Sequence, residues 1–295
     1  MDRISKLPVG VIETILCLLP IHEAARTSIL SREWRYRWIT IPKLVFNEDM
    51  FEVSDYVSEP SVLEQTFDKP SHRKVMTTRC KLFYAIYQVL FMHEGPIHEF
   101  TLSMEVDRSC VEIDHIIRHL SKKNTVKILK LELKWVYKLP LSLFSLHKLT
   151  GLYLSGCVLD HQPSSNVFRS LTTLYLDNIR TCKKELLCLV SSCPSLKRLT
   201  ILSDAGTIND GGDYTIADLI KCVPLIEYLS LMFFIFLINV DEEFDESVMG
   251  PFIPEECSDI LLERLNDLEI LHFCNEENEL AFVKLILAKS PVLKN

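Results

Sequence analysis

The chain has 295 residues, of which 48% are hydrophobic, with only 8 Gly and 13 Pro, a composition typical of a folded protein with a sizeable core. Its formal net charge of −8 argues against general nucleic-acid binding, because that binding depends on cations that displace counterions from phosphates. Its 10 cysteines form no CxxC pair, which favours reduced thiols over a disulfide scaffold.

No secretory or membrane-spanning segment is expected. The start of the chain lacks the apolar run of a signal peptide. The most apolar stretch, residues 225–240, is 16 residues long and contains Glu227, whereas a spanning helix needs about 20 apolar residues. We therefore expect an intracellular protein of the nucleus, the cytoplasm or both.

Near the N-terminus the sequence predicts three short helices. Apolar residues recur at helical spacing over residues 11–19, and a second helix is expected over residues 24–30. Ser31 is a candidate N-cap for a third helix that carries Trp34 and Trp38 on one face. Because about thirty residues bury little apolar surface, this segment is expected to need a partner.

Residues 46–72 are rich in polar residues and proline and are interpreted as a connector. A linking helix is predicted over residues 74–93, since four apolar residues share one helical stripe. They are Leu82, Ile86, Val89 and Leu90.

From residue 96 onwards the sequence repeats an LxxLxL pattern, where L is any large apolar residue. The seven copies are Ile97-Phe100-Leu102, Val126-Leu129-Leu131, Leu149-Leu152-Leu154, Leu171-Leu174-Leu176, Leu196-Leu199-Ile201, Ile226-Leu229-Leu231 and Leu268-Leu271-Phe273. Their middle positions are 29, 23, 22, 25, 30 and 42 residues apart, mostly near the leucine-rich-repeat range of roughly 20–29. The pattern predicts stacked units, each with a short strand whose alternate side chains point inward.

Helices are predicted between these strands, at residues 113–120, 185–190, 217–220 and 280–287. Proline follows three of them, at Pro194, Pro224 and Pro291, and ends the helix because it lacks a backbone donor. By the same logic another strand would start at residue 293, so the last repeat is expected to be incomplete. The 42-residue spacing between the last two copies of the repeat is long because it contains an acidic insertion at 241–259.

The first 38 residues closely resemble the plant F-box, through the segments DRISKLP (2–8), ILCLLP (15–20) and EAARTSILSREWRYRW (23–38). With the later GPIHEF (95–100), the repeats, ELAFVK (279–284) and SPVL (290–293), the chain is similar to the plant F-box/FBD/LRR-repeat family. Val9-Gly10 replace the acidic pair usual in the family. Because glycine weakens helices, the first helix is expected to begin late or fray.

The resemblance implies a substrate-recognition subunit of a Skp-cullin-F-box (SCF) E3 ubiquitin ligase that performs no catalysis itself. An F-box would bind a Skp-family adaptor, and through it a cullin-RING ligase, while the repeats hold an unknown target. Carried over by position, the adaptor-binding residues are Leu7, Pro8, Ile12, Ile15, Leu16, Leu19, Pro20, Ala25, Ser28, Leu30, Ser31, Trp34 and Trp38. The alternative is a truncated or non-degradative scaffold that sequesters a partner.

The predicted fold class is α/β, with an all-α F-box of three short helices followed by a leucine-rich-repeat solenoid. The expected domains are an F-box at 1–45, the connector and linking helix at 46–94, the repeats at 95–275 and the start of an incomplete FBD-like region at 276–295.

Several residues admit a structural or a functional interpretation. Trp34 and Trp38 suit a small core as well as an interface. Arg32, Arg35 and Arg37 are better explained as a solvated face than as a phosphate site.

No metal site or cofactor is predicted. His115 and His119 have the spacing of two zinc ligands but no evident third ligand. Residues 209–213 resemble a calcium loop without its bidentate Glu, so a turn is favoured. The sequence contains no GxSxG, HExxH, P-loop or dinucleotide motif, so an enzyme is not indicated. Target recognition is expected from side chains between the repeat leucines, such as Tyr153, Tyr175, Arg198 and Tyr228.

Overall fold

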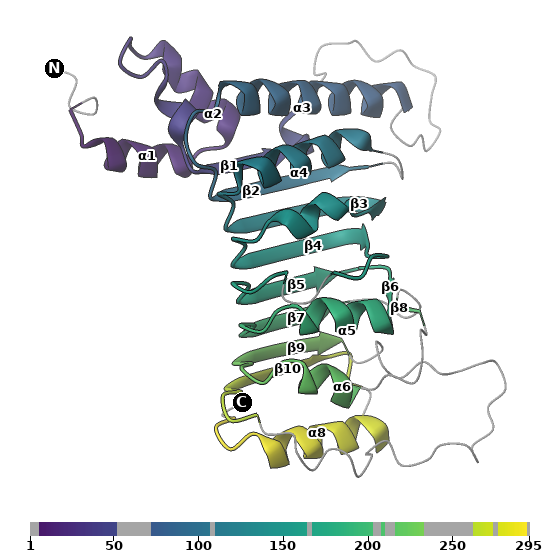
Figure 1. Cartoon of the computed structure of the whole chain (residues 1–295). Helices are drawn as coiled ribbons and strands as arrows, with labels where there is room; N and C mark the ends of the chain where they lie inside the picture. The colour runs from purple at the N-terminus through teal and green to yellow at the C-terminus, as the bar shows by residue number, and fades with distance from the viewer. Residues whose placement is uncertain are drawn as a thin grey trace, which may run out of the picture. The chain divides into compact units, whose positions relative to one another are not determined.

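The computed structural model describes residues 6–51, 72–106, 110–163, 167–202, 208–209, 216–232, 262–273 and 277–293. The acidic insertion and most of the 209–213 stretch lie outside these residues. The chain divides into two compact units, an N-terminal unit (Met1–Val106) and a C-terminal unit (Asp107–Asn295). The fold is mixed α/β, as predicted (Figure 1).

The N-terminal unit begins with two helices, α1 (Val9–Cys17) and α2 (Ile21–Arg26). Each follows a proline, Pro8 or Pro20, whose fixed backbone angle suits the start of a helix. The expectation that α1 would begin late is wrong, since the helix includes both Val9 and Gly10.

The predicted third helix is also wrong. After a 3-10 turn, η1 (Thr27–Ile29), the chain forms turns over residues 32–36 and a second 3-10 helix, η2 (Arg37–Thr40). The N–H of Trp34 donates to the Ser31 carbonyl at 3.2 Å, which closes a turn rather than an α-helical start. The turns still bury both Trp34 and Trp38.

A strand that the sequence analysis missed follows these turns. β1 (Lys43–Asn47) pairs in parallel with β2 (Glu99–Glu105), and the Phe46 and Phe100 rings pack with centroids 5.6 Å apart. A short 3-10 helix, η3 (Glu48–Phe51), follows β1, and the Glu48 carboxylate accepts the Glu105 N–H at 2.6 Å. The connector therefore starts with regular structure, and the rest of it lies outside the described residues.

The predicted linking helix is confirmed as α3 (His72–Met92), and its four stripe residues are buried. The end of α3 packs closely on η2: the N–H of Glu94 donates to the Ile39 carbonyl at 3.0 Å. A Cβ on Gly95 would lie 2.7 Å from the Thr40 carbonyl oxygen, so this approach requires glycine.

The C-terminal unit contains a parallel sheet in the strand order β3-β4-β5-β7-β9-β10. Its strands are β3 (Ile128–Lys138), β4 (Gly151–Val158), β5 (Thr173–Asp177), β7 (Arg198–Leu202), β9 (Tyr228–Met232) and β10 (Asp267–Leu271). A small second sheet pairs β6 (Thr181–Cys182) with β8 (Ile208–Asn209).

Each step between neighbouring strands repeats one hydrogen-bond pattern. The Lys127 carbonyl accepts the N–H groups of Thr150 and Gly151, at 2.7 and 3.0 Å. The Thr150 carbonyl accepts the next pair of N–H groups, and the pattern continues through Thr172, Lys197 and Glu227. This pattern aligns the starts of the strands, although β3 and β4 shift register between Glu132 and Tyr137. The first six predicted repeats are all buried at their apolar positions.

The seventh predicted repeat is out of register. The Glu227 carbonyl accepts from Asn266 and Asp267, and Leu268 pairs with Leu229. The true apolar positions are therefore Leu265-Leu268-Ile270, three residues earlier than predicted. Phe273, the last residue of the predicted copy, is exposed.

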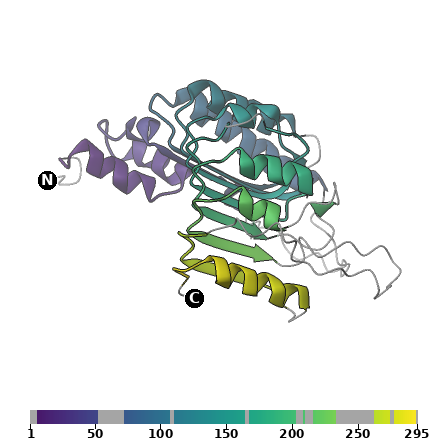
Figure 2. The same cartoon turned by 60° about the horizontal axis from the view of Figure 1, so that its bottom comes forward.

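All four helices predicted between the strands are present, as α4 (Val111–Lys123), α5 (Lys183–Ser191), α6 (Ile216–Lys221) and α8 (Glu277–Lys289). A 3-10 helix, η4 (Leu141–Ser145), stands at the corresponding place between β3 and β4. α4, α5 and α6 lie on one face of the sheet (Figures 1 and 2). The opposite face, called the open face below, carries the alternate strand residues that are not fully buried.

Candidate binding surfaces

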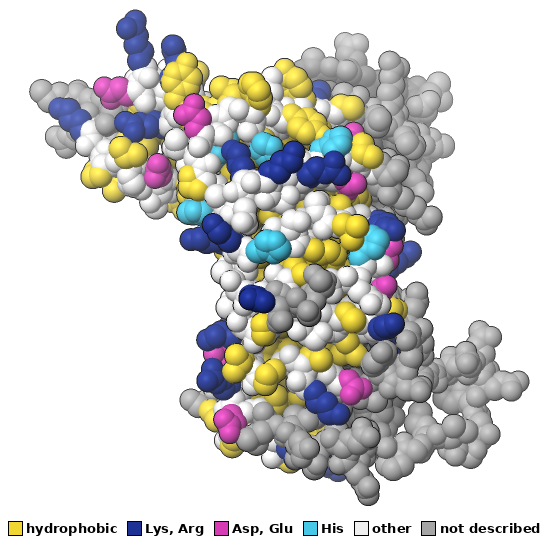
Figure 3. Space-filling view, in the orientation of Figure 1, with side chains coloured by type: hydrophobic (Ala, Val, Ile, Leu, Met, Phe, Trp, Pro, Cys, Tyr) yellow, Lys and Arg dark blue, Asp and Glu magenta, His cyan; other side chains and the backbone are white. Residues whose placement is uncertain are grey.

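Helix α1 is apolar on two sides. Ile12 and Leu16 are buried in the N-terminal unit, while Val11 and Ile15 are exposed one position earlier along the helix. Leu18, just after the helix, is 80% exposed. Exposed apolar side chains that lie close together mark interaction sites, so the outer side of α1 is a candidate contact surface. Figure 3 shows hydrophobic side chains at the surface over α1.

A second group of exposed apolar side chains lies around the turns that follow α2. Ile29 is 86% exposed, Leu30 66% and Tyr36 59%. The Ser28 hydroxyl donates to the Arg35 carbonyl at 2.8 Å, which ties the two ends of this turn region together. The apolar side chains are thus presented by a locally braced backbone.

The thirteen predicted adaptor-binding residues fall into three classes by exposure. Leu7, Pro8, Ile15, Leu19 and Leu30 are exposed, Pro20, Ala25, Ser28 and Ser31 are intermediate, and Ile12, Leu16, Trp34 and Trp38 are buried. The four buried residues can affect partner binding only indirectly, by stabilising the backbone that carries the exposed side chains. Sequence reasoning missed the exposed Val9, Val11, Leu18, Ile29 and Tyr36. Helical spacing from Leu7 and Ile15 could have identified Val11.

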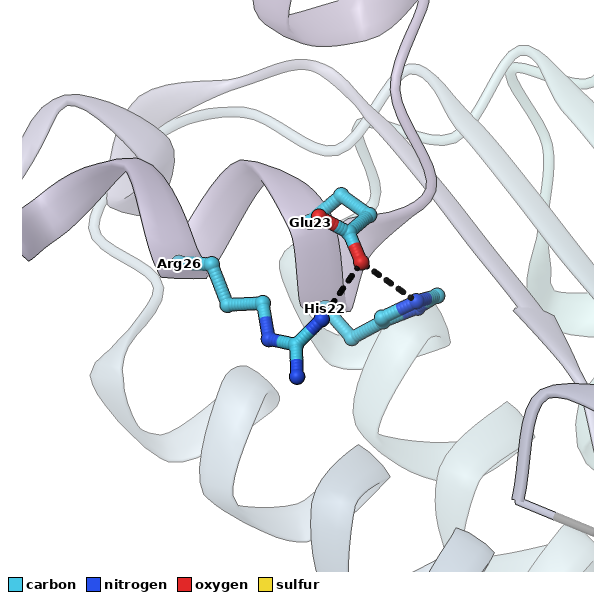
Figure 4. Close-up of polar contacts among 3 residues, drawn as sticks. All are labelled: His22, Glu23 and Arg26. Carbon is cyan, nitrogen blue, oxygen red and sulfur yellow. Dashed lines mark hydrogen bonds and ion pairs between the residues drawn. The ribbon is translucent and has the colours of Figure 1, made fainter. Parts of the chain in front are cut away.

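Polar side chains border this region on α2. One oxygen of Glu23 accepts from Arg26 at 2.8 Å and lies 3.3 Å from Nε2 of His22 (Figure 4). Ile21 and Ala24 of the same helix are buried, so α2 keeps its charged side outward. The Arg26 side chain is largely exposed, and such a pair adds little stability. Of the three arginines predicted to form a solvated face, Arg32 and Arg35 are exposed and Arg37 is partly buried.

The open face of the C-terminal unit carries aromatic and cationic side chains, which stand at mid-strand on β4 and β5 and at the first residue of β7 and β9. The Lys130 ammonium lies 5.2 Å from the centre of the Tyr153 ring, and that ring packs against Tyr175 with centroids 6.0 Å apart. Further along the sheet, the Arg198 guanidinium lies 4.5 Å from the centre of the Tyr228 ring. The contacts join Tyr153 with Tyr175 and Arg198 with Tyr228, and strand pairing and alternation place the two pairs on the same face.

At the far strands, side chains of the open face are joined by hydrogen bonds. The Tyr228 hydroxyl donates to Glu269 at 2.6 Å, and the Ser230 hydroxyl donates to the same oxygen at 3.0 Å. Both bonds favour the ionised carboxylate and lower the pKa of Glu269, while the bond to Glu269 raises the pKa of Tyr228. These hydrogen bonds link side chains of β9 and β10 on the open face.

A pocket of about 490 Å³ lies at the carboxyl ends of these strands. It is lined by Leu133, Lys134, Ser155, Gly156, Asp177, Asn178, Leu202 and Met232. Two of these residues, Gly156 and Asn178, have positive φ angles of 70° and 47°. They turn the backbone beside the pocket, and Asn178 donates its N–H to the Leu202 carbonyl at 2.6 Å.

The helix-bearing face of the C-terminal unit is different. Lys, Arg and His side chains gather there over α4 (Figure 3), which carries Arg118, Lys122 and Lys123 in its second half. Cations near the C-terminus of a helix complement its dipole. Partial burial, with the ammonium groups of Lys123 and Lys122, lowers the pKa of His119. These features have a structural explanation.

Within the described part of the chain, no group of three His, Cys, Asp or Glu residues is arranged to hold a metal ion. None of the helices seen in those same segments has the length and apolar character needed to cross a membrane.

Comparison with known proteins gives a consistent family. Residues 113–210 match the model for the LRR repeats of FBD-associated F-box protein At5g56370. F-box/FBD/LRR-repeat protein At1g13570 of Arabidopsis thaliana is 36% identical over 201 residues, which cover 68% of this chain and 44% of the relative. F-box/FBD/LRR-repeat protein At2g04230 of the same plant is 30% identical over 210 residues, 68% of this chain and 42% of the relative.

FBD-associated F-box protein At5g56370 itself, also from Arabidopsis thaliana, is 25% identical over 248 residues, 78% of this chain and 54% of that protein. The matches thus span about half the length of these curated relatives. The family model falls on the strands and helices that form the repeating sheet. The chain belongs to the F-box/FBD/LRR-repeat protein family.

Proposed function

We propose that this protein is the substrate-recognition subunit of an SCF E3 ubiquitin ligase. Its F-box, residues 1–45, binds a Skp-family adaptor that connects it to a cullin-RING ligase. Its repeats, residues 95–275, form a leucine-rich-repeat solenoid whose open face holds the target, and the FBD-like region begins at 276. The chain performs no catalysis, and it contributes proximity by raising the effective concentration of the target beside the ubiquitin carrier.

The apolar surface of residues 7–36 carries the adaptor assignment. Among the described residues of this segment, nine large apolar side chains are exposed: Leu7, Val9, Val11, Ile15, Leu18, Leu19, Ile29, Leu30 and Tyr36. Exposed apolar patches of this kind mark protein interaction sites. Burying one leucine at an interface contributes about 1.5–3 kcal/mol, so a few of these residues suffice for stable binding.

The test is a pull-down of a purified plant Skp-family adaptor with the full chain and with a Leu18→Ala/Leu30→Ala variant. We expect the variant to bind at least about tenfold more weakly, because two exposed leucines would lose their interface contacts. Leu141→Ala is the matched control, since Leu141 is 62% exposed in the C-terminal unit, close to the 66% of Leu30. Failure of the wild-type chain to bind, or an equal loss in the control, would reject the adaptor role.

A second measurement separates degradation from sequestration. Induction of the chain in plant cells, followed by proteome-wide abundance measurement, should show cullin-dependent loss of a target. Adaptor binding without any such loss would favour the non-degradative scaffold.

A further inference from the structure

The pocket on the open face has a polar side and an apolar side. Ser155, Asp177 and Asn178 supply polar groups, and Leu133, Leu202 and Met232 supply apolar ones. Ser155 pairs with Asp177 across neighbouring strands, and Asp177 pairs with Leu202 on the next. The polar and apolar sides therefore follow each other along the sheet. From β4 to β9, an extended segment crossing the strands would meet the Asp177 carboxylate first and then Leu202 and Met232, while Leu133 and Lys134 lie on the β3 side.

The carboxylate of Asp177 is held in place. It is half-buried, and the Ser155 hydroxyl donates to its Oδ2 at 2.8 Å. Fixing one oxygen in this way orients the other without neutralising the charge. A preorganised, partly desolvated carboxylate forms stronger hydrogen bonds with cations than one in free solution.

The surroundings of Asp177 add to the negative potential. Glu132 precedes Ser155 in the same cross-strand row, so the row reads Glu132, Ser155, Asp177. Besides partial burial, the carboxylates of Asp177 and Glu132 raise the pKa of Tyr175. The Tyr175 ring therefore stands beside two acidic groups, and aromatic faces also attract cations.

Among the described residues of the pocket lining, Lys134 is the one cationic side chain, and it is exposed, whereas Asp177 is half-buried. Its ammonium group is a strongly hydrated point charge on a flexible stem, and its exposure screens its charge more than that of Asp177. Charge selection inside the pocket is therefore set by Asp177, while Lys134 weakens it.

We propose that this pocket binds a lysine or arginine side chain of the target, with a neighbouring apolar residue of the target against Leu202 and Met232. This inference rests on the proposed role of the repeats in holding a target, and it specifies the chemistry of that target. The stem of the cationic side chain packs on the apolar wall while its head reaches Asp177.

The probe is a displayed library of random peptides, selected on the immobilised full chain. Enriched peptides should share a Lys or Arg next to an apolar residue. For a synthetic copy of one enriched peptide, Asp177→Asn should weaken binding by about tenfold or more, because it removes a charge-assisted hydrogen bond. Lys134→Gln should leave binding unchanged or strengthen it about two- to threefold, because it removes a competing cation.

The matched control is Asp160→Asn. Asp160 is an exposed acid of the same unit that pairs with Lys138 at 2.6 Å and does not line the pocket, so its loss should not change the affinity. A Ser155→Ala variant tests the positioning of Asp177 and should weaken binding less than Asp177→Asn. Thermal melting of each variant verifies that the fold is kept.

Four results would overturn the inference. They are no enrichment of any peptide, enriched peptides without a basic residue, no effect of Asp177→Asn, and loss of binding in Lys134→Gln, which would indicate an anionic ligand. Adaptor binding is measured on the same preparations. If the chain does not bind the adaptor but binds the peptide, the result contradicts the ligase role alone. If it binds the adaptor but not the peptide, the result contradicts the proposed ligand of the pocket alone.

Discussion

In the C-terminal unit, the large apolar residues of the repeats are buried from Val126 to Leu231. In residues 7–36, by contrast, nine large apolar side chains are exposed while Ile12, Leu16, Trp34 and Trp38 form the interior. Both regions are rich in leucine and isoleucine. The difference shows that the number of apolar residues in a region does not reveal whether they stabilise the fold of the chain or form a surface for a partner.

The backbone explains the difference. A parallel strand between two neighbours presents alternate residues to one side, and the next repeat covers the same side again. A single short helix such as α1 has no repeat beside it and can bury only one stripe. The outer stripe of α1 is therefore apolar without being needed for the unit's own core.

Matched leucine substitutions test this comparison with the largest expected effect. Leu174→Ala should lower the free energy of unfolding by about 2–5 kcal/mol, because a fully buried leucine leaves a cavity. Leu18→Ala should change it by no more than about 0.5 kcal/mol, because Leu18 is largely exposed. Urea unfolding of each purified variant gives both values.

Leu16→Ala is the control, since Leu16 is fully buried in the same helix that precedes Leu18. If the burial of a leucine decides the effect, rather than the unit in which it lies, Leu16→Ala should lower the free energy of unfolding by as much as Leu174→Ala. An equal cost for Leu18→Ala and Leu16→Ala would mean that the outer side of α1 packs within the unit, and the comparison would fail.

A smaller effect is expected at the end of β5. Asn178 has a φ of 47°, a left-handed conformation that Asn tolerates better than most residues. Asn178→Ala should destabilise the C-terminal unit by about 1 kcal/mol, because alanine lacks this tolerance. Chemical denaturation measures the change.

Asn178→Gly is the companion variant, because glycine adopts positive φ freely. It should stay close to wild type in stability. If Asn178→Gly loses as much stability as Asn178→Ala, the amide side chain rather than the backbone angle determines the stability at this site.

The register of the last strand shows what the sequence could not decide. Leu265-Leu268-Ile270 and Leu268-Leu271-Phe273 both fit the repeat pattern. A shift of three residues keeps leucine at the first two positions of either copy. Only the hydrogen bonds of Asn266 and Asp267 to the Glu227 carbonyl select the first alternative. The six earlier copies have the predicted register, with all of their apolar positions buried.

The N-terminal unit was less predictable for a different reason. β1 gains its partner from Lys43 pairing with Glu99, more than fifty residues later. β1 is only five residues long, and Val45 stands between the buried Leu44 and Phe46, so the local sequence does not show a clear apolar and polar alternation. The third predicted helix failed because Trp34 and Trp38 can also be buried by turns, and their spacing alone does not distinguish the two.

For the candidate sites, sequence reasoning identified a group of partly exposed side chains but not the pocket beside it. Tyr153, Tyr175 and Tyr228 alternate with buried leucines, so their exposure follows from strand periodicity. The pocket depends on the backbone turns at Gly156 and Asn178, where that periodicity ends. Strand alternation predicts which face a side chain occupies but not the shape of the surface at the strand ends.

The smallest expected effect concerns the hydrogen-bonded end of the open face, where the pKa of Glu269 is lowered by Tyr228 and Ser230. A carboxyl whose pKa is lower in the folded state stabilises the fold above its unfolded pKa, and this contribution is lost as the pH falls through the folded pKa. The melting temperature of the wild type should therefore drop slightly more than that of Glu269→Gln between about pH 5 and pH 3, since the unfolded pKa lies near 4.3. The difference is small because Glu269 is exposed.

Tyr228→Phe should remove part of this difference in melting temperature, because the hydrogen bond from Ser230 to Glu269 remains. Parallel melting curves for wild type and Glu269→Gln would contradict this account, since the lowered pKa of Glu269 requires its hydrogen bonds to persist in solution.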